Sequence, residues 1–322
     1  MQDGWSRLST LGRVGAFLHE ARHTQGYKHL ICERGPYQGT QVLACDRNFA
    51  DGGSFAVEME YYARVAVQGE NFHPVFKKMA RLMAMAKSNI FFNTVPMQRR
   101  EGLFGLSSDG RVGFLYDGGS WVQREIAQST GHLKRTSYGA VLFDGVDAFA
   151  IDPYQNAENS NSVKDTYSYF KLLAENKKST KEFEEFDSGL KRFVVHISKE
   201  NILNQYDFAR GTWGPDLQLP FDVVKISTAI PGKIQTGLFF IDGQGQIHAY
   251  QPETQRLVSQ NLIWNFSDKN VVSFKDQTLI LKNDGKIYIQ NEQGVKLWDG
   301  AKSKFSDLVS VPLYDSFEVV KK

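Results

Sequence analysis

The chain has 322 residues, of which 38 are Lys or Arg and 36 are Asp or Glu, so its formal net charge is +2. A charge this small excludes strong electrostatic binding to nucleic acid or to an anionic membrane, and no apolar run approaches the ~18 residues that would cross a bilayer. Two cysteines, Cys32 and Cys45, are too few for a disulfide-rich scaffold or a multi-cysteine metal cluster, and the length suits about two domains.

The first predicted element is a helix that begins near Leu11 and ends at Gly26. Its apolar face is formed by residues at the i, i+3, i+4 and i+7 spacing of a helix: Val14, Phe17, Leu18 and Ala21. Gly26 suits the end of this helix because glycine adopts positive φ readily and lets the chain leave sharply.

The sequence from His19 to His29, on and just after this helix, reads HExxHxxGxxH. Residues four apart share a helix face, so His19 and His23 are predicted to point two imidazoles at one metal ion. The turn at Gly26 is expected to bring His29 back as a third ligand. Three protein ligands leave a fourth zinc position open, which is the arrangement of catalytic zinc sites. Glu20 is predicted to receive the proton of a water whose pKa the metal lowers to ~7.

These residues resemble the zinc-binding signature of the metzincin clan of metallopeptidases. The resemblance implies that His19, His23 and His29 bind Zn²⁺ and that Glu20 is the general base in hydrolysis of a peptide or protein substrate. We therefore expect a zinc-dependent metallohydrolase, most directly a peptidase. The alternative is a secreted, non-catalytic binding or scaffold protein with a structural or vestigial zinc site, which the charged Arg22 between the two histidines favours.

Two further helices are predicted, over 55–67 and from 72 to about 88, because apolar residues recur there at helical spacing. The first of them carries Glu58 and Glu60. Either carboxylate is an alternative third zinc ligand in place of His29, as in zinc enzymes whose third ligand is a glutamate on a later helix.

The two cysteines flank the segment that follows His29. A disulfide between Cys32 and Cys45 would stabilise the fold by about 3 kcal/mol in the chain-entropy model and would fit an extracellular or periplasmic protein. Two buried thiols in a cytoplasmic protein are the alternative. The chain carries no signal peptide, so export predicts a further segment upstream of Met1.

After about residue 98 the pattern changes to strands and turns. An apolar strand, a polar turn and an alternating strand recur, with a glycine in the turn of the clearest copies. Five segments share this pattern: 102–115, 140–152, 193–206, 237–250 and 277–290. Their spacing of about 45 residues resembles the blade length of a β-propeller.

The predicted fold class is therefore an α+β multidomain protein. A small, mainly α-helical, zincin-like segment at 1–95 would precede an all-β, β-propeller-like domain of about five repeats at 98–322. A polar, charge-dense insertion is expected near 155–191. The propeller is expected to present a substrate or a protein partner on its surface, as repeat surfaces commonly do. Zn²⁺ is the cofactor expected, and neither nucleic acid nor a membrane span is.

Overall fold

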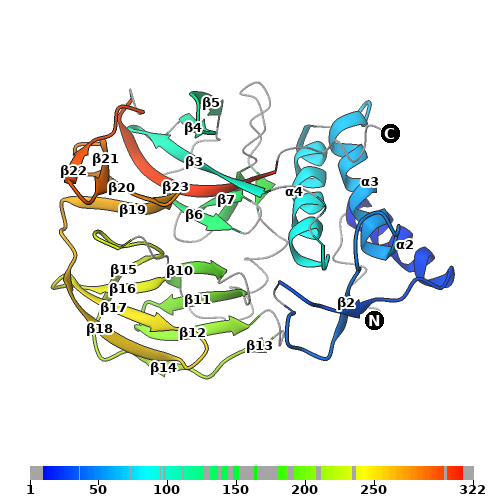
Figure 1. Cartoon of the computed structure of the whole chain (residues 1–322), viewed down its shortest axis with the longest axis horizontal. Coiled ribbons are helices and arrows are strands. Elements are labelled where there is room, and N and C mark those ends of the chain that lie inside the picture. Colours follow the sequence, from blue (N-terminus) through cyan, green and yellow to red (C-terminus); the bar gives the residue numbers. More distant parts are fainter. Residues whose placement is uncertain are drawn as a thin grey trace.

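A computed structural model describes the protein over the following residues: 10–35, 37–72, 74–94, 96, 99–110, 112–125, 131–136, 139–143, 148–151, 163–164, 180–187, 192–207, 212–233, 237–300 and 303–314. Within these ranges the helices are α2 (Thr10–Thr24), α3 (Ser54–Gln68) and α4 (Pro74–Ile90), which lie together beside a larger body of strands (Figure 1). All three helices are too short or too polar to cross a membrane.

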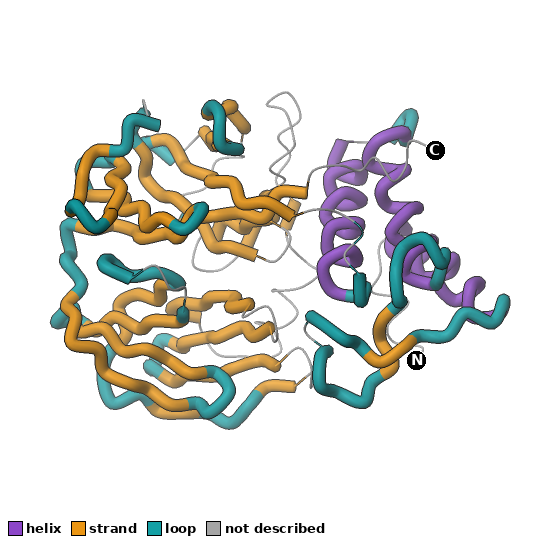
Figure 2. The backbone as a smooth tube through the Cα atoms, in the orientation of Figure 1, coloured by secondary structure: helices purple, strands orange, loops and turns teal. Residues whose placement is uncertain are grey.

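The strands of the larger body form five antiparallel sheets (Figure 2). One sheet contains, in order, β23 (Phe305–Tyr314), β3 (Arg99–Ser107), β4 (Val112–Tyr116) and β5 (Trp121–Glu125). The next contains β6 (His132–Thr136), β7 (Gly139–Phe143), β8 (Ala148–Ile151) and β9 (Val163–Lys164). The third contains β10 (Thr180–Asp187), β11 (Arg192–Ser198), β12 (Ile202–Asp207) and β13 (Thr212–Trp213), with β14 (Leu217–Gln218) also paired to β12.

The last two sheets continue in chain order. The first of them contains β15 (Val223–Ser227), β16 (Leu238–Asp242), β17 (Gln246–Gln251) and β18 (Arg256–Ile263). The second contains β19 (Asp268–Phe274), β20 (Gln277–Lys282), β21 (Ile287–Asn291) and β22 (Gly294–Leu297). A separate two-stranded sheet, β1 (Leu30–Ile31) with β2 (Leu43–Cys45), lies near the helices (Figure 1).

The sheets close into a ring through the two ends of the strand-rich region. Strand β23 pairs antiparallel with β3, so residues 305–314 lie beside residues 99–107 (Figure 1). The first strands of neighbouring sheets also contact one another: β23 contacts β6 and β19, and β10 contacts β6 and β15. Sheets of antiparallel strands that meet through their inner strands and are joined end to end form a β-propeller-like fold.

The hairpins expected from the repeated pattern are present as the middle strands of these sheets. Their turns explain the recurring glycine, because Gly110, Gly245 and Gly285 have φ of 71°, 83° and 82°. At Gly245 a Cβ atom would lie 2.8 Å from the Trp264 carbonyl oxygen, so the backbone approaches too closely for a side chain. Asn201 takes this place between β11 and β12 with φ of 62°, and for that reason this copy looks weaker in the sequence.

The predicted fold class, an α+β multidomain protein with a zincin-like helical segment, is wrong. Strands dominate the described residues, and the helices are accompanied only by the short β1–β2 sheet, whereas a zincin places a substantial sheet against its metal-binding helix. The helices also share a core with the propeller. Buried residues of α3 and α4 form one apolar cluster with Val141 and Phe143 of β7, Phe183 of β10 and Val194 of β11.

The described part of the stretch near 155–191 is not the polar insertion that the sequence predicts. Residues 180–187 form β10, an inner strand in which Glu184 and Glu185 are buried. Charged residues therefore face the interior here, which hydrophobic patterning alone does not reveal. Residues 152–162, 165–179 and 188–191 lie outside the described residues. The domain division at 95–98 stays a prediction.

Candidate metal centre

Helix α2 and the turn that ends it bring the three predicted histidines together. His19 and His23 lie one turn apart on α2. The N–H of Gly26 donates to the His23 carbonyl (3.0 Å) and the N–H of Tyr27 donates to the Arg22 carbonyl (3.3 Å). This pair of bonds is a Schellman ending, and Gly26 adopts the positive φ of 91° that it requires. The chain then reverses toward the helix.

The three imidazoles face one another through their Nε2 atoms. The Nε2 atom of His19 lies 3.1 Å from that of His29 and 3.2 Å from that of His23. Each of the three histidines offers one ring nitrogen, and these three nitrogens lie within 4.8 Å of one another. Phe55 of α3 forms an apolar floor, with its ring stacked on His29 at 4.6 Å between centroids.

The other nitrogen of each ring is hydrogen bonded to an oxygen of the protein. The Nδ1–H of His19 donates to Glu58 Oε2 (3.1 Å), and that of His29 donates to Asp46 Oδ1 (3.2 Å). The Nδ1–H of His23 donates to the Tyr27 carbonyl (2.6 Å). These acceptors fix the tautomers, because a neutral imidazole that carries its proton on Nδ1 presents a lone pair at Nε2.

This donor set fits a transition metal such as zinc. Three lone pairs pointing at one place repel one another unless a cation lies between them, and zinc binds neutral imidazole nitrogen. Two nitrogens at the tetrahedral angle, each ~2.0–2.1 Å from zinc, are about 3.3 Å apart, close to the 3.1 and 3.2 Å separations of the Nε2 atoms. Carboxylates behind the ligand histidines are the usual outer partners of such sites.

Glu58 contacts the Nδ1 side of the His19 ring, opposite the Nε2 atom. It also accepts from the Tyr62 hydroxyl (3.1 Å) and pairs with Lys87 (3.0 Å). Burial raises the pKa of Glu58, but the hydrogen bond from His19 and the charge of Lys87 outweigh it and leave the pKa below its ordinary 4.5. Glu60 instead pairs with Arg64 on the surface. Neither carboxylate shares the place where the Nε2 atoms meet.

Asp46 connects His29 to the start of α3. While Oδ1 accepts from His29, Oδ2 accepts from the backbone N–H groups of Phe55 (2.9 Å) and Ala56 (3.1 Å). It thereby caps α3 from another part of the chain, since the N-cap residue Gly53 makes no side-chain cap. Sequence reasoning missed Asp46 and the role of Glu58, and the one local signal was a carboxylate directly after Cys45.

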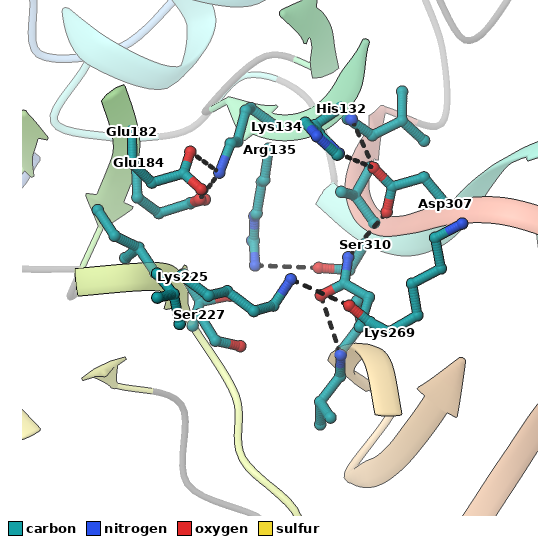
Figure 3. A pocket seen from close by; sticks show the side chains of 18 residues that line it. His132, Lys134, Arg135, Glu182, Glu184, Lys225, Ser227, Lys269, Asp307 and Ser310 are labelled. Carbon is teal, nitrogen blue, oxygen red and sulfur yellow. Dashed lines mark hydrogen bonds and ion pairs between the residues drawn. The ribbon is translucent and has the colours of Figure 1, made fainter. Parts of the chain in front are cut away.

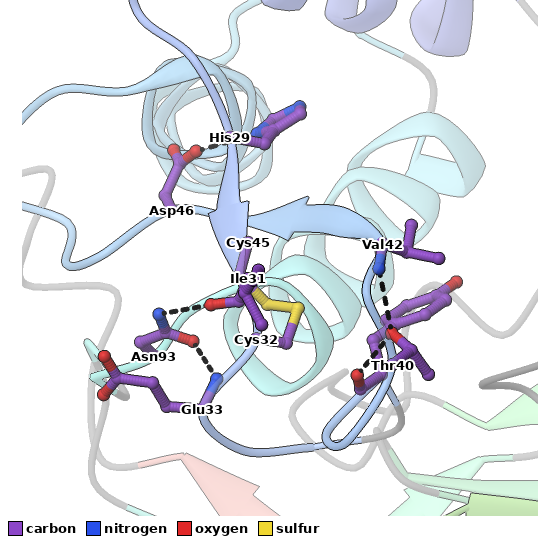
Figure 4. The surroundings of a disulfide bond; sticks show 10 residues. His29, Ile31, Cys32, Glu33, Thr40, Val42, Cys45, Asp46 and Asn93 are labelled. Carbon is purple, nitrogen blue, oxygen red and sulfur yellow. Dashed lines mark hydrogen bonds and ion pairs between the residues drawn. A yellow bond between two sulfur atoms is a disulfide. The ribbon is translucent and has the colours of Figure 1, made fainter.

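The two cysteines hold Asp46 and His29 in place. Cys32 and Cys45 form a disulfide with their Cα atoms 5.2 Å apart, which confirms the disulfide among the two alternatives (Figure 4). Leu30 pairs with Cys45 across β1 and β2. Because the two strands are antiparallel, His29 and Asp46 extend from the same end of this crosslinked strand pair, and Figure 4 shows the hydrogen bond between them.

Substituting Asp46 by alanine is expected to lower the free energy of unfolding by about 1–3 kcal/mol, because two helix N–H groups and the His29 N–H lose their acceptor. Urea unfolding followed by circular dichroism measures this loss. Asp51→Ala, at an exposed position in the same connection, is the matched control and should change stability by less than about 0.5 kcal/mol. Equal effects of the two substitutions would contradict the capping role.

Glu20 and Arg22 are the two charged residues of α2 next to the histidines, and their surroundings differ. Glu20 is exposed on α2 and, among the described residues, makes no ion pair. Arg22 donates through Nε to the Gly52 carbonyl (2.8 Å), and its guanidinium lies 3.8 Å from the centroid of the Tyr27 ring. The charge between the two histidines therefore ties the helix end to the connection before α3 and does not enter the cluster.

No protein-family model matches the chain, and no curated protein matches it significantly. Among solved structures, the β-propeller domain of Cps50 (Swd1) from Myceliophteria thermophila aligns with 64% of this chain and 74% of its own at 11% identity and a TM-score of 0.30. YCF48 bound to D1 peptide aligns with 56% of this chain and 58% of its own at 16% identity and a TM-score of 0.34.

BBS1N in complex with ARL6DN aligns with 61% of this chain and 60% of its own at 10% identity and a TM-score of 0.30. The chain thus spans less than two thirds of BBS1N and of YCF48. Similarities this low carry no statement on activity or ligands. The order of its sheets and their closure through β23 and β3 give this chain a β-propeller-like fold.

Proposed function

We propose that this protein is a zinc-binding protein built on a β-propeller, with His19, His23 and His29 as the ligands. The observation that supports this most directly is the convergence of their Nε2 atoms at 3.1 and 3.2 Å while each Nδ1–H is held by an oxygen. That pattern prepares three lone pairs for one cation before any cation binds.

The role we favour for this site is structural, within a non-catalytic binding protein. The ligands come from α2 and from the residue before β1, and their outer partners come from α3 and the residue after β2. A metal held by these groups would link α2, α3 and the β1–β2 strand pair at one point. The exposed Glu20 and the short β1–β2 sheet provide little of what positions a peptide for cleavage.

A protein partner is proposed for the propeller surface. Exposed apolar side chains occur on the outer strands of two consecutive sheets and in the segment that joins these sheets: Val258, Ile263, Phe266, Val295 and Leu297. Exposed apolar side chains are the groups that protein interfaces cover. The disulfide supports an oxidising location, and we propose an extracellular or periplasmic protein.

Zinc-dependent hydrolysis, most directly of a peptide, is the second candidate. It is favoured by one observation, that three protein ligands leave a coordination position of zinc for a further group. A zinc ion bound here would supply Lewis acidity to that group. Glu20, which follows His19 on the exposed side of α2, would then hold the transferred proton.

Metal analysis after mild purification tests the site itself. We expect one zinc per chain, and we expect His23→Ala to weaken binding by about 100-fold or more, because a ligand is lost. His132→Ala is the matched control, since the side chain of His132 is 80% exposed and far from the cluster in sequence. Zinc at about 100 times its Kd should add about 2.7 kcal/mol to the stability of the wild type. Equal zinc binding by all three proteins would contradict the proposal.

Comparison of the wild type with Glu20→Gln separates the two roles. If the site is structural, both proteins bind zinc equally, gain equal stability from it and cleave no peptide. If the site is catalytic, the wild type cleaves a peptide library, and Glu20→Gln loses about 100-fold or more of that activity while it retains zinc.

A further inference from the structure

A cavity of about 190 Å³ lies where the inner strands of the propeller meet, and Ser227 and Ser310 are in its wall (Figure 3). The Ser227 hydroxyl donates to the Ala229 carbonyl (2.6 Å), and the Ser310 hydroxyl accepts from the Arg135 side chain (3.3 Å). Neither an amide carbonyl nor a guanidinium takes up a proton near neutral pH. These contacts therefore do not make either serine a nucleophile.

Ser259, on the outer strand β18, has a histidine as its partner instead. Its Oγ atom lies 3.0 Å from Nδ1 of His248, which is opposite it on β17. The Nε2 atom of the same ring lies 3.3 Å from Oδ2 of Asp242, the last residue of β16. We call these three residues the Ser259 triad. They form one hydrogen-bonded chain of hydroxyl, imidazole and carboxylate, an arrangement that is recognised by its geometry on unrelated folds.

The carboxylate of the triad is fixed by the turn between β16 and β17. Asp242 Oδ1 accepts from the backbone N–H groups of Gln244 (2.9 Å) and Gln246 (2.9 Å). Burial raises the pKa of Asp242, but the hydrogen bonds from His248 and from these two N–H groups outweigh it and leave the pKa below its ordinary 3.8. An ionised carboxylate can only accept, so Nε2 of His248 carries the proton and Nδ1 presents a lone pair.

The base of the triad is shielded, whereas its hydroxyl is open to the solvent. The Phe221 ring stacks on the His248 ring with centroids 3.9 Å apart, and the side chain of His248 is only 10% exposed. Ser259 is exposed. Because Nδ1 presents a lone pair, the Ser259 O–H donates to it. A hydroxyl that donates to a base, which a third group orients in turn, is the arrangement that activates a serine.

We propose that Ser259 is a covalent acylation site for an activated carboxylic ester, with His248 as its base and Asp242 as the residue that positions the base. The Oγ atom forms a bond to the ester carbonyl carbon while its proton passes to Nδ1 of His248. The carbon–oxygen bond of the ester then breaks, and the departing alcohol takes this proton. The product is an ester of Ser259, with one acyl group captured per chain. This step requires neither zinc nor turnover, so it goes beyond the zinc-binding role proposed above.

A fluorophosphonate reagent on the full chain tests the nucleophile, because it bonds to activated serines and its adduct can be mapped by peptide mass spectrometry. We expect one adduct per chain, on Ser259, formed about 100-fold faster or more than on Ser108. Ser108 is the internal control, since it is exposed in the β3–β4 turn and has no histidine partner among the described residues. Equal rates on the two serines would show that the proposal is wrong.

Asp242→Asn distinguishes an activating triad from one that only stabilises the sheet. The asparagine oxygen can still accept from Gln244 and Gln246, so the urea midpoint should be retained. Its amide donates to Nε2 of His248, which moves the imidazole proton to Nδ1 and removes the base. Labelling of Ser259 should therefore fall about 100-fold or more, as it should in His248→Gln.

Asp284→Asn is the matched control for this variant and should label as the wild type does. Asp284 lies in the next hairpin turn and accepts from the Lys286 N–H (2.9 Å) and from the hydroxyl of Tyr288 (3.1 Å), so no histidine takes part. If Asp242→Asn and Asp284→Asn label equally, or if labelling persists in His248→Gln, the triad serves the fold alone and the proposal is overturned.

The ester p-nitrophenyl acetate tests acyl transfer itself. We expect an acetyl group on Ser259 and release of nitrophenol at a rate that Ser259→Ala lowers about tenfold or more. Because zinc can also activate an ester, His23→Ala is measured in parallel. Release that persists in His23→Ala supports the triad. Release that is lost with His23 but not with Ser259 assigns the reaction to the metal and overturns the proposal, and the zinc analysis decides the metal site separately.

Discussion

Lys134→Met is expected to destabilise the folded protein by about 3–5 kcal/mol near pH 8, because it leaves Glu182 and Glu184 without their cation in the propeller interior. The side chains of Lys134 and Glu184 are each 7% exposed, so water replaces the lost partner poorly. Methionine keeps most of the aliphatic volume of lysine, which limits the change to the charge. Urea unfolding of the wild type and the variant measures the difference.

The size of this loss should depend on pH. Burial raises the pKa of Glu184 to about 7, against its ordinary 4.5. Because the folded-state pKa is the higher one, this carboxyl contributes stability that is fully present below pH 4.5 and lost as the pH rises through about 7. Burial lowers the pKa of Lys134, but the charges of Glu182 and Glu184 outweigh it and raise the pKa above 10.5, so the lysine stays charged throughout. The loss on Lys134→Met should therefore be smaller at about pH 5 than at about pH 8.

Lys181→Met provides the matched control for this prediction. Lys181 also pairs with a carboxylate, Asp222, but the two side chains are 29% and 67% exposed. Exposed ion pairs contribute about 0–1 kcal/mol, since water and salt screen them. A loss for Lys134→Met that is no larger than the loss for Lys181→Met, or that does not change with pH, would contradict the assignment of a buried ion pair.

Replacement of both cysteines by serine is expected to lower the free energy of unfolding by about 3 kcal/mol, because the crosslink restricts the unfolded chain. The effect should extend to the histidine cluster. Cys45 directly precedes Asp46, and Cys32 lies three residues after His29. The positions of Asp46 and His29 therefore depend on the strand pair that the disulfide crosslinks. Zinc affinity should therefore fall together with stability, by about tenfold.

Reduction of the disulfide in the wild type is the control for this prediction. Cys32 and Cys45 are the protein's two cysteines, so a reducing agent can act on no other pair. A reductant should destabilise the wild type to the level of the Cys32→Ser/Cys45→Ser variant and leave that variant unchanged. Wild-type stability that is the same with and without reductant would show that the crosslink contributes nothing.

Several parts of the fold follow from patterns within a short stretch of chain. The apolar spacing from Leu11 onward predicts the existence of α2, and Gly26 predicts its end. The predicted apolar face is wrong in part, because Val14 and Phe17 are exposed and the helix is buried at Leu11, Gly12 and Gly15. The hairpins of the sheets follow from alternation and from glycine in the turn. What failed was the inference from one motif to a whole fold class, since HExxHxxGxxH specifies how three side chains meet and leaves open what surrounds them.

The burial of charged residues on an inner strand could not be predicted from the sequence pattern either. The stretch 180–187 is dense in charge and therefore reads as a solvated surface. In the structure it is β10, where Glu184 is buried because Lys134, 50 positions earlier, neutralises it. A charged residue can be assigned to the interior only when its partner is known, and the partner comes from another sheet.

By itself, the sequence determined the helix that presents His19 and His23 and the repeated turns of the propeller. Both depend on backbone periodicity and on positive φ, which act over a few residues. Tertiary structure alone decided which carboxylates hold the N–H groups of His19 and His29, 39 positions away at Glu58 and 17 at Asp46. It also closed the ring through bonds such as that from Leu133 to Asp307, 174 positions apart. These contacts arise when packing brings distant elements together, so no local pattern encodes them.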